Sequence, residues 1–319
     1  MLSRRLALSA GVLAVAGLLG GSAAQYVLAA PRVEATPAAG CAGSANLIAN
    51  SSVNRIVTVN GVERHFRVHL PAGYNRGKAS PLIVAFHGRG EQADAFEHYT
   101  QLSRLPAIAV YPEGLRSAEG PRSWQSAPYA NPRADDVEFT RAVIRTVRSE
   151  ACVDNSRVFA VGRSNGGGLA NLVACRLPGQ FAAVAMVSGA FYPQSQAGCA
   201  GTRPVSRIEF HGTADQIIPY GGMEKFGFAL PPIPAVVGGW AAGAGCQRPV
   251  ERKIAADVTR IDWPACQPLG VMVSHVRIDG GTHRWPGSSG ALWRPSNRIN
   301  AAALIWQFFQ LQRPGLIGS

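Results

Sequence analysis

A serine flanked by glycines stands in the segment Gly162-Arg163-Ser164-Asn165-Gly166. An apolar, β-rich run precedes the segment and a stretch with helical character follows it. In this strand–turn–helix context, G-x-S-x-G is the signature of a nucleophilic serine, because the tight reversal exposes the hydroxyl at the edge of a sheet. The helix that begins there adds N–H donors and the positive end of its dipole. The pattern predicts Ser164 as a nucleophile, and an incidental serine in a glycine-rich turn is the alternative.

A serine hydroxyl needs a general base, and His283 is the best placed of the seven histidines. It follows the last apolar run of the chain, in a segment whose glycines and proline predict a loop (residues 279–287). The main rival is His211, which ends an apolar run ahead of Gly212 and is more typical of a packed or loop-orienting histidine. The chain order nucleophile, acid, base expected for a serine in this context favours His283.

Asp215 is the predicted third member, four residues after the strand that ends at His211. A carboxylate there would accept a hydrogen bond from the imidazole and stabilise its charged form. A simple turn-forming aspartate is the alternative. The rival carboxylates are Asp257, Asp262 and Asp279.

Two backbone N–H groups are expected to stabilise the oxyanion of the transition state. One belongs to Asn165, directly after the nucleophile, and the other to Arg89 in the loop 86–90. The Arg89 side chain would contact a polar substrate or be solvated. Trp124 and Trp285 would stack on a substrate ring or lie in the core. The apolar segment 226–232 would line a substrate pocket or pack on the surface.

The elements that must position these residues follow from periodicity. Segments 55–59 and 62–70 alternate around Asn60-Gly61, a pair preferred in tight hairpins. Continuous apolar runs then follow, as is typical of strands buried on both faces of a parallel sheet. We expect these strands at Pro81–His87, Ala107–Tyr111, Arg157–Gly162, Ala182–Ser188, Val205–His211 and Val271–Ile278, and helices at 136–150, 165–175 and 297–312. The prediction is an α/β fold with a mostly parallel sheet, opened by an antiparallel hairpin and covered by helices on both faces.

The N-terminus resembles a signal peptide. Arg4 and Arg5 precede an uncharged apolar stretch, and Ser22-Ala23-Ala24 offers small residues for cleavage after Ala24. The alternative is an uncleaved membrane anchor within residues 6–30. We expect a signal peptide (1–24), a flexible leader (25–50) and one catalytic domain (51–313), with the protein extracellular or periplasmic.

Six cysteines follow the predicted cleavage site, and an even number in an exported chain predicts disulfides. Cys246 and Cys266, close in sequence, are the predicted pair, while the other connectivities stay open. No Cys/His set has zinc-site spacing, so no metal site is predicted. No Walker or Rossmann fingerprint is present, so no cofactor is implied.

The formal net charge is +12, but the arginines are scattered without a basic stripe. Nucleic-acid binding is therefore not expected, and membrane contact is expected only if the N-terminal segment stays uncleaved.

Several stretches of the chain, from Asn54 to Gln312, resemble the secreted esterase family that groups polyhydroxybutyrate depolymerases with feruloyl and acetylxylan esterases. They are FHGRG (86–90), YPEG (111–114), DDVEF (135–139), CVDNSRVFAVGRSNGGG (152–168), HGTADQIIPYGG (211–222), WAAGAGC (240–246) and THRWPG (282–287). The resemblance implies an α/β-hydrolase fold and hydrolysis of carboxylic esters by Ser164, Asp215 and His283. The implied substrates are oligomeric hydroxyalkanoates or plant cell-wall esters. Thr282 and Arg284 depart from the family's usual neighbours of the histidine.

Two other functions share these features. A non-catalytic binding protein could keep the hydrolase scaffold, since fold alone does not give activity, and a peptidase could use the same triad.

Overall fold

The computed structural model describes residues 39–41, 47–288 and 299–312. The predicted signal peptide, the leader up to residue 38 and the expected start of the last helix at Asn297 lie outside the described residues. The described residues all belong to one compact unit, 35–319. In these described ranges, no helix combines the length and apolar character needed to cross a membrane.

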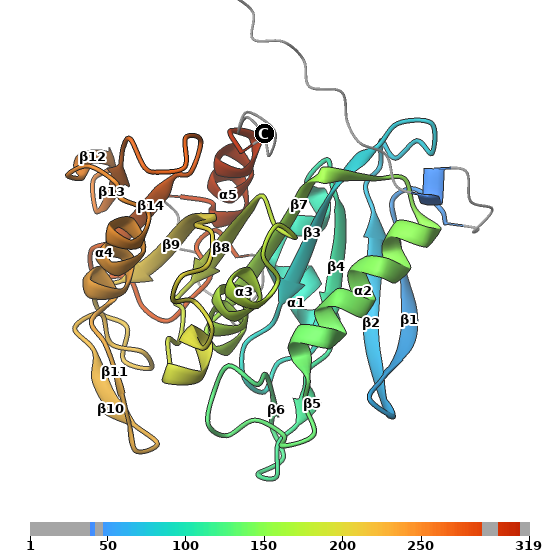
Figure 1. Cartoon of the computed structure of the whole chain (residues 1–319), viewed down its shortest axis with the longest axis horizontal. Helices are drawn as coiled ribbons and strands as arrows, with labels where there is room; N and C mark the ends of the chain where they lie inside the picture. The colour runs from blue at the N-terminus through green and yellow to red at the C-terminus, as the bar shows by residue number, and fades with distance from the viewer. Residues whose placement is uncertain (1–38, 42–46, 289–298, 313–319) are drawn as a thin grey trace, which may run out of the picture. The chain divides into compact units, whose positions relative to one another are not determined.

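Ten strands form one sheet in the order β1-β2-β4-β3-β7-β8-β9-β14-β13-β12 (Figure 1). The six central strands run parallel. They are β4 (Ile108–Pro112), β3 (Ser80–Phe86), β7 (Val153–Arg163), β8 (Ala183–Val187), β9 (Ser206–Gly212) and β14 (Val273–Ile278). These are the six strands expected from the apolar runs, and the predicted α/β-hydrolase fold is confirmed.

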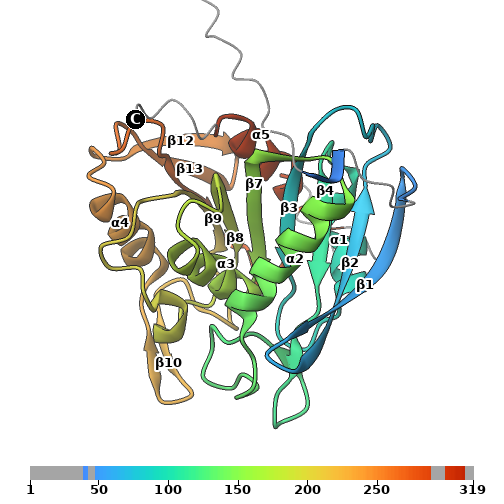
Figure 2. The same ribbon diagram turned by 45° about the vertical axis from the view of Figure 1, so that its right-hand side comes forward.

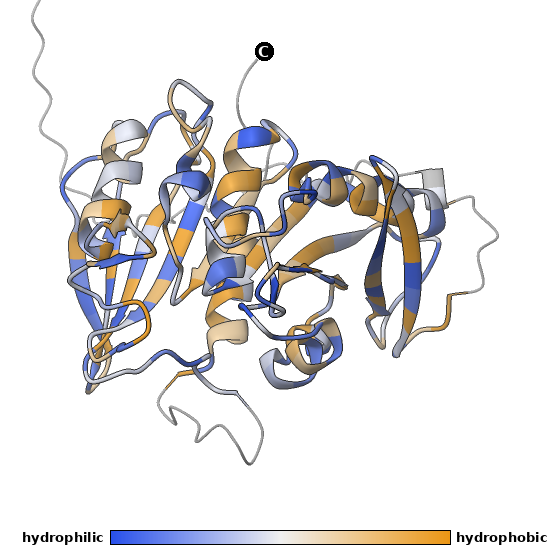
Figure 3. Cartoon of the chain, turned by 90° about the horizontal axis from the view of Figure 1, so that it is seen from below, coloured by the Kyte–Doolittle hydropathy of each residue, from blue (hydrophilic) through white to orange (hydrophobic). Residues whose placement is uncertain are grey.

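Antiparallel hairpins flank the parallel strands at both edges. The predicted hairpin joins β1 (Ser51–Val59) and β2 (Val62–Leu70), and its turn residues Asn60 and Gly61 have φ angles of 50° and 75°. Positive φ at both turn positions is what a type I′ turn requires. The second hairpin, β12 (Val250–Ala255) with β13 (Val258–Trp263), was not predicted. Hydrophilic and hydrophobic bands alternate along several strands of the sheet (Figure 3).

Helices cover both faces of the sheet, as predicted. On one face lie α2 (Asp136–Glu150), α3 (Asn165–Arg176) and α4 (Ile233–Gly243), seen in front of the strands in Figures 1 and 2. On the other lie α1 (Ala93–Thr100) and α5 (Ala301–Gln310). Alternate residues of β3 feed the two cores: Leu82 and Val84 pack with α2 and α3, whereas Ile83 and Ala85 pack with α1 and α5. This explains why the central strands read as unbroken apolar runs.

Short elements complete the connections, several of them beyond the carboxyl ends of the parallel strands. They are η1 (Ala39–Cys41), η2 (Leu102–Arg104), η3 (Pro193–Gln196), β5 (Leu115–Arg116), β6 (Arg122–Ser123), β10 (Met223–Lys225) and β11 (Phe228–Leu230).

Three disulfides join Cys41 to Cys152, Cys175 to Cys199 and Cys246 to Cys266. The predicted pair is confirmed. The first bond fastens η1 to the chain just before β7.

Candidate active site

Ser164 occupies a sharp turn between β7 and α3, with φ 54° and ψ −122°. Steric constraints explain why glycine occupies both flanking positions, 162 and 166. A Cβ at Gly162 would lie 1.9 Å from the carbonyl oxygen of Gly166, and one at Gly166 would lie 2.2 Å from that of Phe86. Any larger residue would push these backbones apart. A non-glycine residue held at positive φ stores strain that is typical of functional sites, and the turn leaves Ser164 partly exposed.

The imidazole of His283 and the carboxylate of Asp215 lie together, with 2.7 Å between Nδ1 and Oδ2. They come from the loops after β14 and β9, which the sheet places side by side. A Cβ at Gly212 would lie 2.1 Å from the carbonyl oxygen of Gly281, so the two loops are in direct backbone contact. Ala214 N–H also donates to Gly281 O at 2.9 Å. This packing sets the distance between acid and base.

The buried side chain of Arg163, next to the serine, connects these loops to the turn. Its guanidinium donates to the backbone carbonyl of His283 at 2.7 Å and pairs with the carboxylate of Glu91. Glu91 in turn accepts a hydrogen bond from Gly88 N–H at 2.8 Å. Ser164 Oγ itself makes no hydrogen bond within the described part of the chain. Catalytic hydrogen bonds are often long without substrate and tighten in the complex.

The electrostatics keep His283 neutral and Asp215 charged. Burial lowers the pKa of His283, and the positive charge of Arg163 lowers it further, against the raising effect of Asp215. Burial raises the pKa of Asp215, but hydrogen bonds from His211 and His283 outweigh it and hold this pKa well below the usual range. A neutral imidazole oriented by a carboxylate is the state that a general base needs.

His211, the rival base, is fully buried beneath the acid. Its Nδ1 lies 2.8 Å from Glu209, and its Nε2 lies 2.8 Å from Ile218 O and 3.3 Å from Asp215. Burial lowers the pKa of His211, but Glu209 and Asp215 more than compensate and raise it to about 10. This raised pKa favours the charged imidazolium, and the contacts of His211 with Ile218 and Asp215 orient the loop of Asp215.

The other rival carboxylates lie at the β12–β13 side of the sheet. Asp257 is in the turn between β12 and β13. Asp262 and Asp279 pair with Arg260 and Arg277, each at 2.9 Å. The carboxylate recorded at His283 is that of Asp215.

The loops of the two expected oxyanion donors adjoin, since Gly166 abuts Phe86. Asn165 is the first residue of α3, so its N–H has no acceptor within the helix. In the other loop, Gly88 N–H is bonded to Glu91 and Gly90 N–H to Arg122 O, both at 2.8 Å. Among the described residues, no acceptor is recorded for the N–H of Arg89. The backbone of Arg89 thus retains a donor for a substrate oxygen.

The expectation that Trp124 and Trp285 stack on a substrate is wrong for this structure. Their exposed fractions are 0% and 1%. Trp124 Nε1 donates to His87 O at 2.7 Å, and Trp285 packs edge-on against Phe96, with 5.9 Å between ring centroids. Both indoles are therefore covered by protein. Trp124 packs under the loop that contains His87, and Trp285 packs against α1.

An aromatic cluster lies beside Arg89, and one of its rings, Phe226, belongs to the segment 226–232 that was expected to line a pocket or pack on the surface. The ring of Tyr129 lies 5.0 Å from Phe226 and 5.9 Å from Tyr192, between centroids. The guanidinium carbon of Arg89 lies 4.4 Å from the Tyr129 centroid. Phe226, at the turn between β10 and β11, is 44% exposed. Tyr192 follows Ala190, whose N–H donates to the carbonyl of Ser164 at 3.0 Å. The aromatic cluster therefore lies near the nucleophile and keeps an accessible ring.

Comparison with known proteins identifies esterases as similar to this chain. The family model described as esterase PHB depolymerase matches residues 64–210. NocK of Nocardia uniformis subsp. tsuyamanensis, named as an esterase, is 31% identical over 261 residues, 74% of each chain. Feruloyl esterase B of Piromyces equi is 33% identical over 161 residues, covering 49% of this chain and only 30% of that protein.

A solved structure shares the fold. The acetyl xylan esterase from Aspergillus awamori aligns with a TM-score of 0.59 at 15% identity, covering 81% of this chain and 99% of that one. The solved structure shows the shared fold, and the sequence matches show that the chain belongs to the α/β-hydrolase esterase family of polyhydroxybutyrate depolymerases and feruloyl esterases, and is a carboxylic ester hydrolase.

Proposed function

We propose that the chain is an exported serine esterase that works by two-step acyl transfer. Ser164 Oγ attacks the ester carbonyl carbon while His283 takes its proton, and Asp215 stabilises the imidazolium. The bond to the leaving alcohol breaks as His283 returns the proton to it. Water, deprotonated by His283, then attacks the acyl-enzyme. The bond to Ser164 Oγ breaks as His283 returns the proton to this oxygen, which releases the carboxylic acid and the free serine.

The oxyanion of both tetrahedral intermediates would lie between the N–H groups of Asn165 and Arg89. Preorganised donors of this kind act where negative charge develops in the transition state. The amino end of α3 adds a favourable dipole.

One observation carries the proposal. Asp215 Oδ2 lies 2.7 Å from His283 Nδ1, and the backbone carbonyl of His283 accepts a hydrogen bond from Arg163, the residue next to Ser164. In support of this, Asp215, His283 and the strained Ser164 each follow the carboxyl end of a parallel strand.

The test is covalent labelling with a fluorophosphonate, together with hydrolysis of p-nitrophenyl acetate. Ser164→Ala should lose both the label and the hydrolysis while its circular dichroism is unchanged. Ser149→Ala, on the exposed side of α2, should retain both. Hydrolysis by Ser164→Ala at the wild-type rate would refute the assignment. Absence of label and turnover in the wild type would favour a non-catalytic binding protein, and cleavage of peptides alone would favour a peptidase.

The aromatic cluster favours an ester whose acyl group carries a ring, such as a feruloyl ester, over hydroxybutyrate oligomers or acetylated polysaccharide. Aromatic side chains add about 0.5–1.5 kcal/mol to a ring contact beyond the buried area. Phe226→Ala should therefore lower kcat/KM for a feruloyl sugar roughly threefold to tenfold, with little change for p-nitrophenyl acetate. Leu269→Ala, an exposed residue outside the cluster, serves as the control. Equal losses for both esters would exclude a ring-binding role.

Export is supported by the three disulfides, which form and persist in oxidising compartments. N-terminal sequencing of protein recovered from the medium or periplasm should begin at Gln25. Recovery in the membrane fraction with Met1 intact would show an uncleaved anchor instead.

A further inference from the structure

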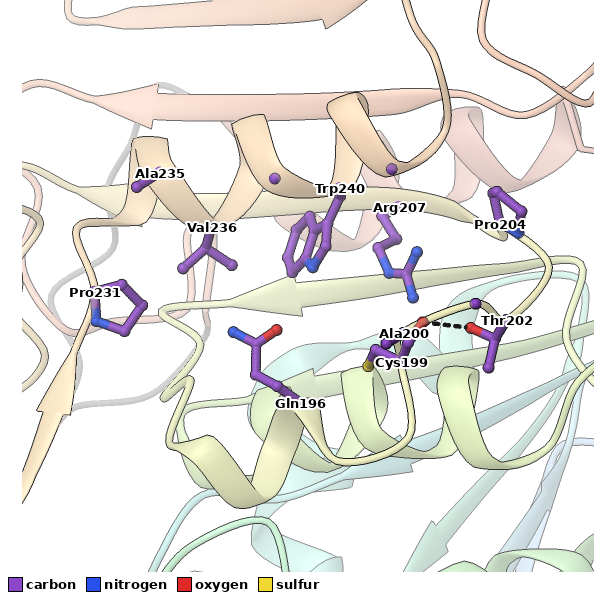
Figure 4. Close-up of a pocket in the computed structure, with 13 residues that line it drawn as sticks. Gln196, Cys199, Ala200, Thr202, Pro204, Arg207, Pro231, Ala235, Val236 and Trp240 are labelled. Carbon is purple, nitrogen blue, oxygen red and sulfur yellow. Dashed lines mark hydrogen bonds between the residues drawn. The ribbon is translucent and has the colours of Figure 1, made fainter.

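A groove with a volume of about 560 Å³ lies between α4 and the segment 196–204 (Figure 4). Its described lining includes Pro204, Pro231, Val236 and Trp240, so its walls are largely apolar. This volume is within the usual range of small-molecule sites. None of the residues assigned to the catalytic machinery lines the groove.

Arg207 is the only charged residue among the described residues of this lining. Its side chain projects between α4 and the loop that carries Cys199 and Thr202 (Figure 4), and only 7% of the residue is exposed. The guanidinium contacts Asn171 Oδ1 at 3.3 Å, Val205 O at 3.4 Å and the sulfur of Cys175 at 3.5 Å. All three partners are neutral, and the two oxygen acceptors lie at long hydrogen-bond distances.

Within the part of the chain that the structure describes, no carboxylate pairs with this charge. Arg207 takes part in none of the ion pairs recorded across the described ranges. Burial lowers the pKa of Arg207 to about 10, as expected for a cation removed from water without an opposite charge. A buried charge is costly unless it is paired, and a bound anion would supply the missing partner.

Trp240 gives the groove an aromatic wall next to this cation. The indole is half-buried, and the guanidinium carbon of Arg207 lies 5.5 Å from its centroid. Edge-on packing against Phe191, with 5.3 Å between centroids, fixes the orientation of the ring. A fixed ring beside a guanidinium suits a ligand that has a flat apolar body and an anionic end.

The charged end of the groove, at Arg207, is distant from the proposed acid. Arg207 lies near the start of β9, and Gly212 at the strand's end is five residues further on. At about 3.3 Å per residue, these positions are roughly 16 Å apart. Asp215 lies beyond Gly212, in the loop that approaches His283.

We propose that this groove is a second binding site, for a monocarboxylate with an aromatic or aliphatic body. Its carboxylate pairs with the guanidinium of Arg207, and its body packs against Trp240 and Val236. A single guanidinium matches a single carboxylate in charge and fork geometry. A phosphate would need further cationic donors, which the described lining lacks. The proposal does not depend on the acyl-transfer mechanism.

The test is calorimetric titration of the full chain with 3-phenylpropionate, using its neutral amide as the ligand control. Arg207→Gln should weaken binding at least about tenfold, as for loss of a charged hydrogen bond. Arg203→Gln removes an exposed arginine of the neighbouring loop and should leave the affinity within about twofold.

A second pair of variants tests the groove without touching the arginine. A Cβ on either Gly238 or Gly239 of α4 meets no atom within 4 Å, but only Gly239 lines the groove. Because residues other than glycine favour a helix interior, neither substitution threatens the fold. Gly239→Leu should abolish binding by filling the groove, whereas Gly238→Leu should bind as the wild type does.

Three results would overturn the proposal. Absence of 3-phenylpropionate binding to the wild type is the first. The second is binding that none of the variants alters, which would place the ligand elsewhere, for instance at Ser164. The third is equal affinity for the amide or for inorganic phosphate, which would remove the carboxylate requirement.

Discussion

The guanidinium of Arg163 donates a 2.7 Å hydrogen bond to the backbone carbonyl of His283, so the residue beside the serine holds the loop of the base. The same guanidinium pairs with Glu91, which also accepts hydrogen bonds from Gly88 N–H and, at 2.9 Å, from Tyr99 OH. One partly buried ion pair thereby links three loops. We assign Arg163 a positioning role in the proposed mechanism, separate from the reacting groups.

Arg163→Met should lower kcat/KM for p-nitrophenyl acetate by roughly tenfold to a hundredfold, which corresponds to the loss of about 1.5–3 kcal/mol from a charged hydrogen bond. The acid limb of the pH profile should also move to higher pH. The reason is that the charge of Arg163 lowers the pKa of His283, and its removal lets that pKa rise.

The pH shift distinguishes electrostatic positioning from general damage to the fold. Arg145→Met, which removes an exposed arginine from α2, should change neither the rate nor the profile. A slower Arg163→Met enzyme whose acid limb stays in place would argue against the electrostatic part of this role.

The midpoint of the acid limb in the wild-type pH profile of kcat/KM can also be predicted. His283 must be neutral to accept a proton, and burial together with Arg163 lowers its pKa below the ordinary value of 6.5. As the pH falls, kcat/KM should decline with a midpoint below 6.5, measured with a substrate that does not titrate in this range. A midpoint above 6.5 would show that another group controls activity or that Asp215 dominates the environment of His283.

The sequence predicted the elements that rest on short-range patterns. The six central strands are continuous apolar runs because both faces of the sheet are covered, and the turn at Ser164 follows from glycines that backbone contacts require. The β12–β13 hairpin was missed because β12 is a largely exposed, charged edge strand at Glu251, Arg252 and Lys253.

Short-range sequence patterns could not predict contacts between residues that are far apart in the chain. The Arg163–Glu91 pair spans 72 positions, and nothing near either residue in the sequence indicates the other. The burial of Trp124 and Trp285 likewise depends on which loops fold over them, and composition alone leaves an indole equally suited to core or site.

Asp215→Asn tests the third catalytic role. The amide can accept the same backbone hydrogen bonds, but it cannot stabilise an imidazolium or fix the imidazole tautomer. We expect kcat to fall by roughly 10³–10⁴ at neutral pH, as in comparable triads. Asp279→Asn is the matched control. This aspartate lies in the loop after β14 and pairs with Arg277, and the structure shows no contact between it and His283 among the described residues. If the two variants are equally active, Asp215 is not the acid.

Glu209 contacts His211, which in turn contacts the proposed catalytic acid Asp215. Removing the charge of Glu209 should therefore lower the stability of the fold more than the rate of hydrolysis. Its buried carboxylate lies between His211 and His275, at 2.8 and 3.0 Å. Breaking a buried ion pair by neutralising one partner costs about 3–5 kcal/mol, so Glu209→Gln should lower the free energy of unfolding in urea by roughly that amount. Glu224→Gln, on an exposed strand, should cost little.

The pH dependence of this loss has a definite sign. The pKa of His211 rises from 6.5 to about 10 on folding, chiefly because Glu209 outweighs the effect of burial. Stability from a raised pKa is complete below the unfolded value and is lost as the pH rises through the folded value. The difference between wild type and Glu209→Gln should therefore be largest near pH 6 and shrink towards pH 10. A difference that stays constant over this range would mean that His211 is neutral in the folded protein, and Asp215 would then be held by an uncharged neighbour.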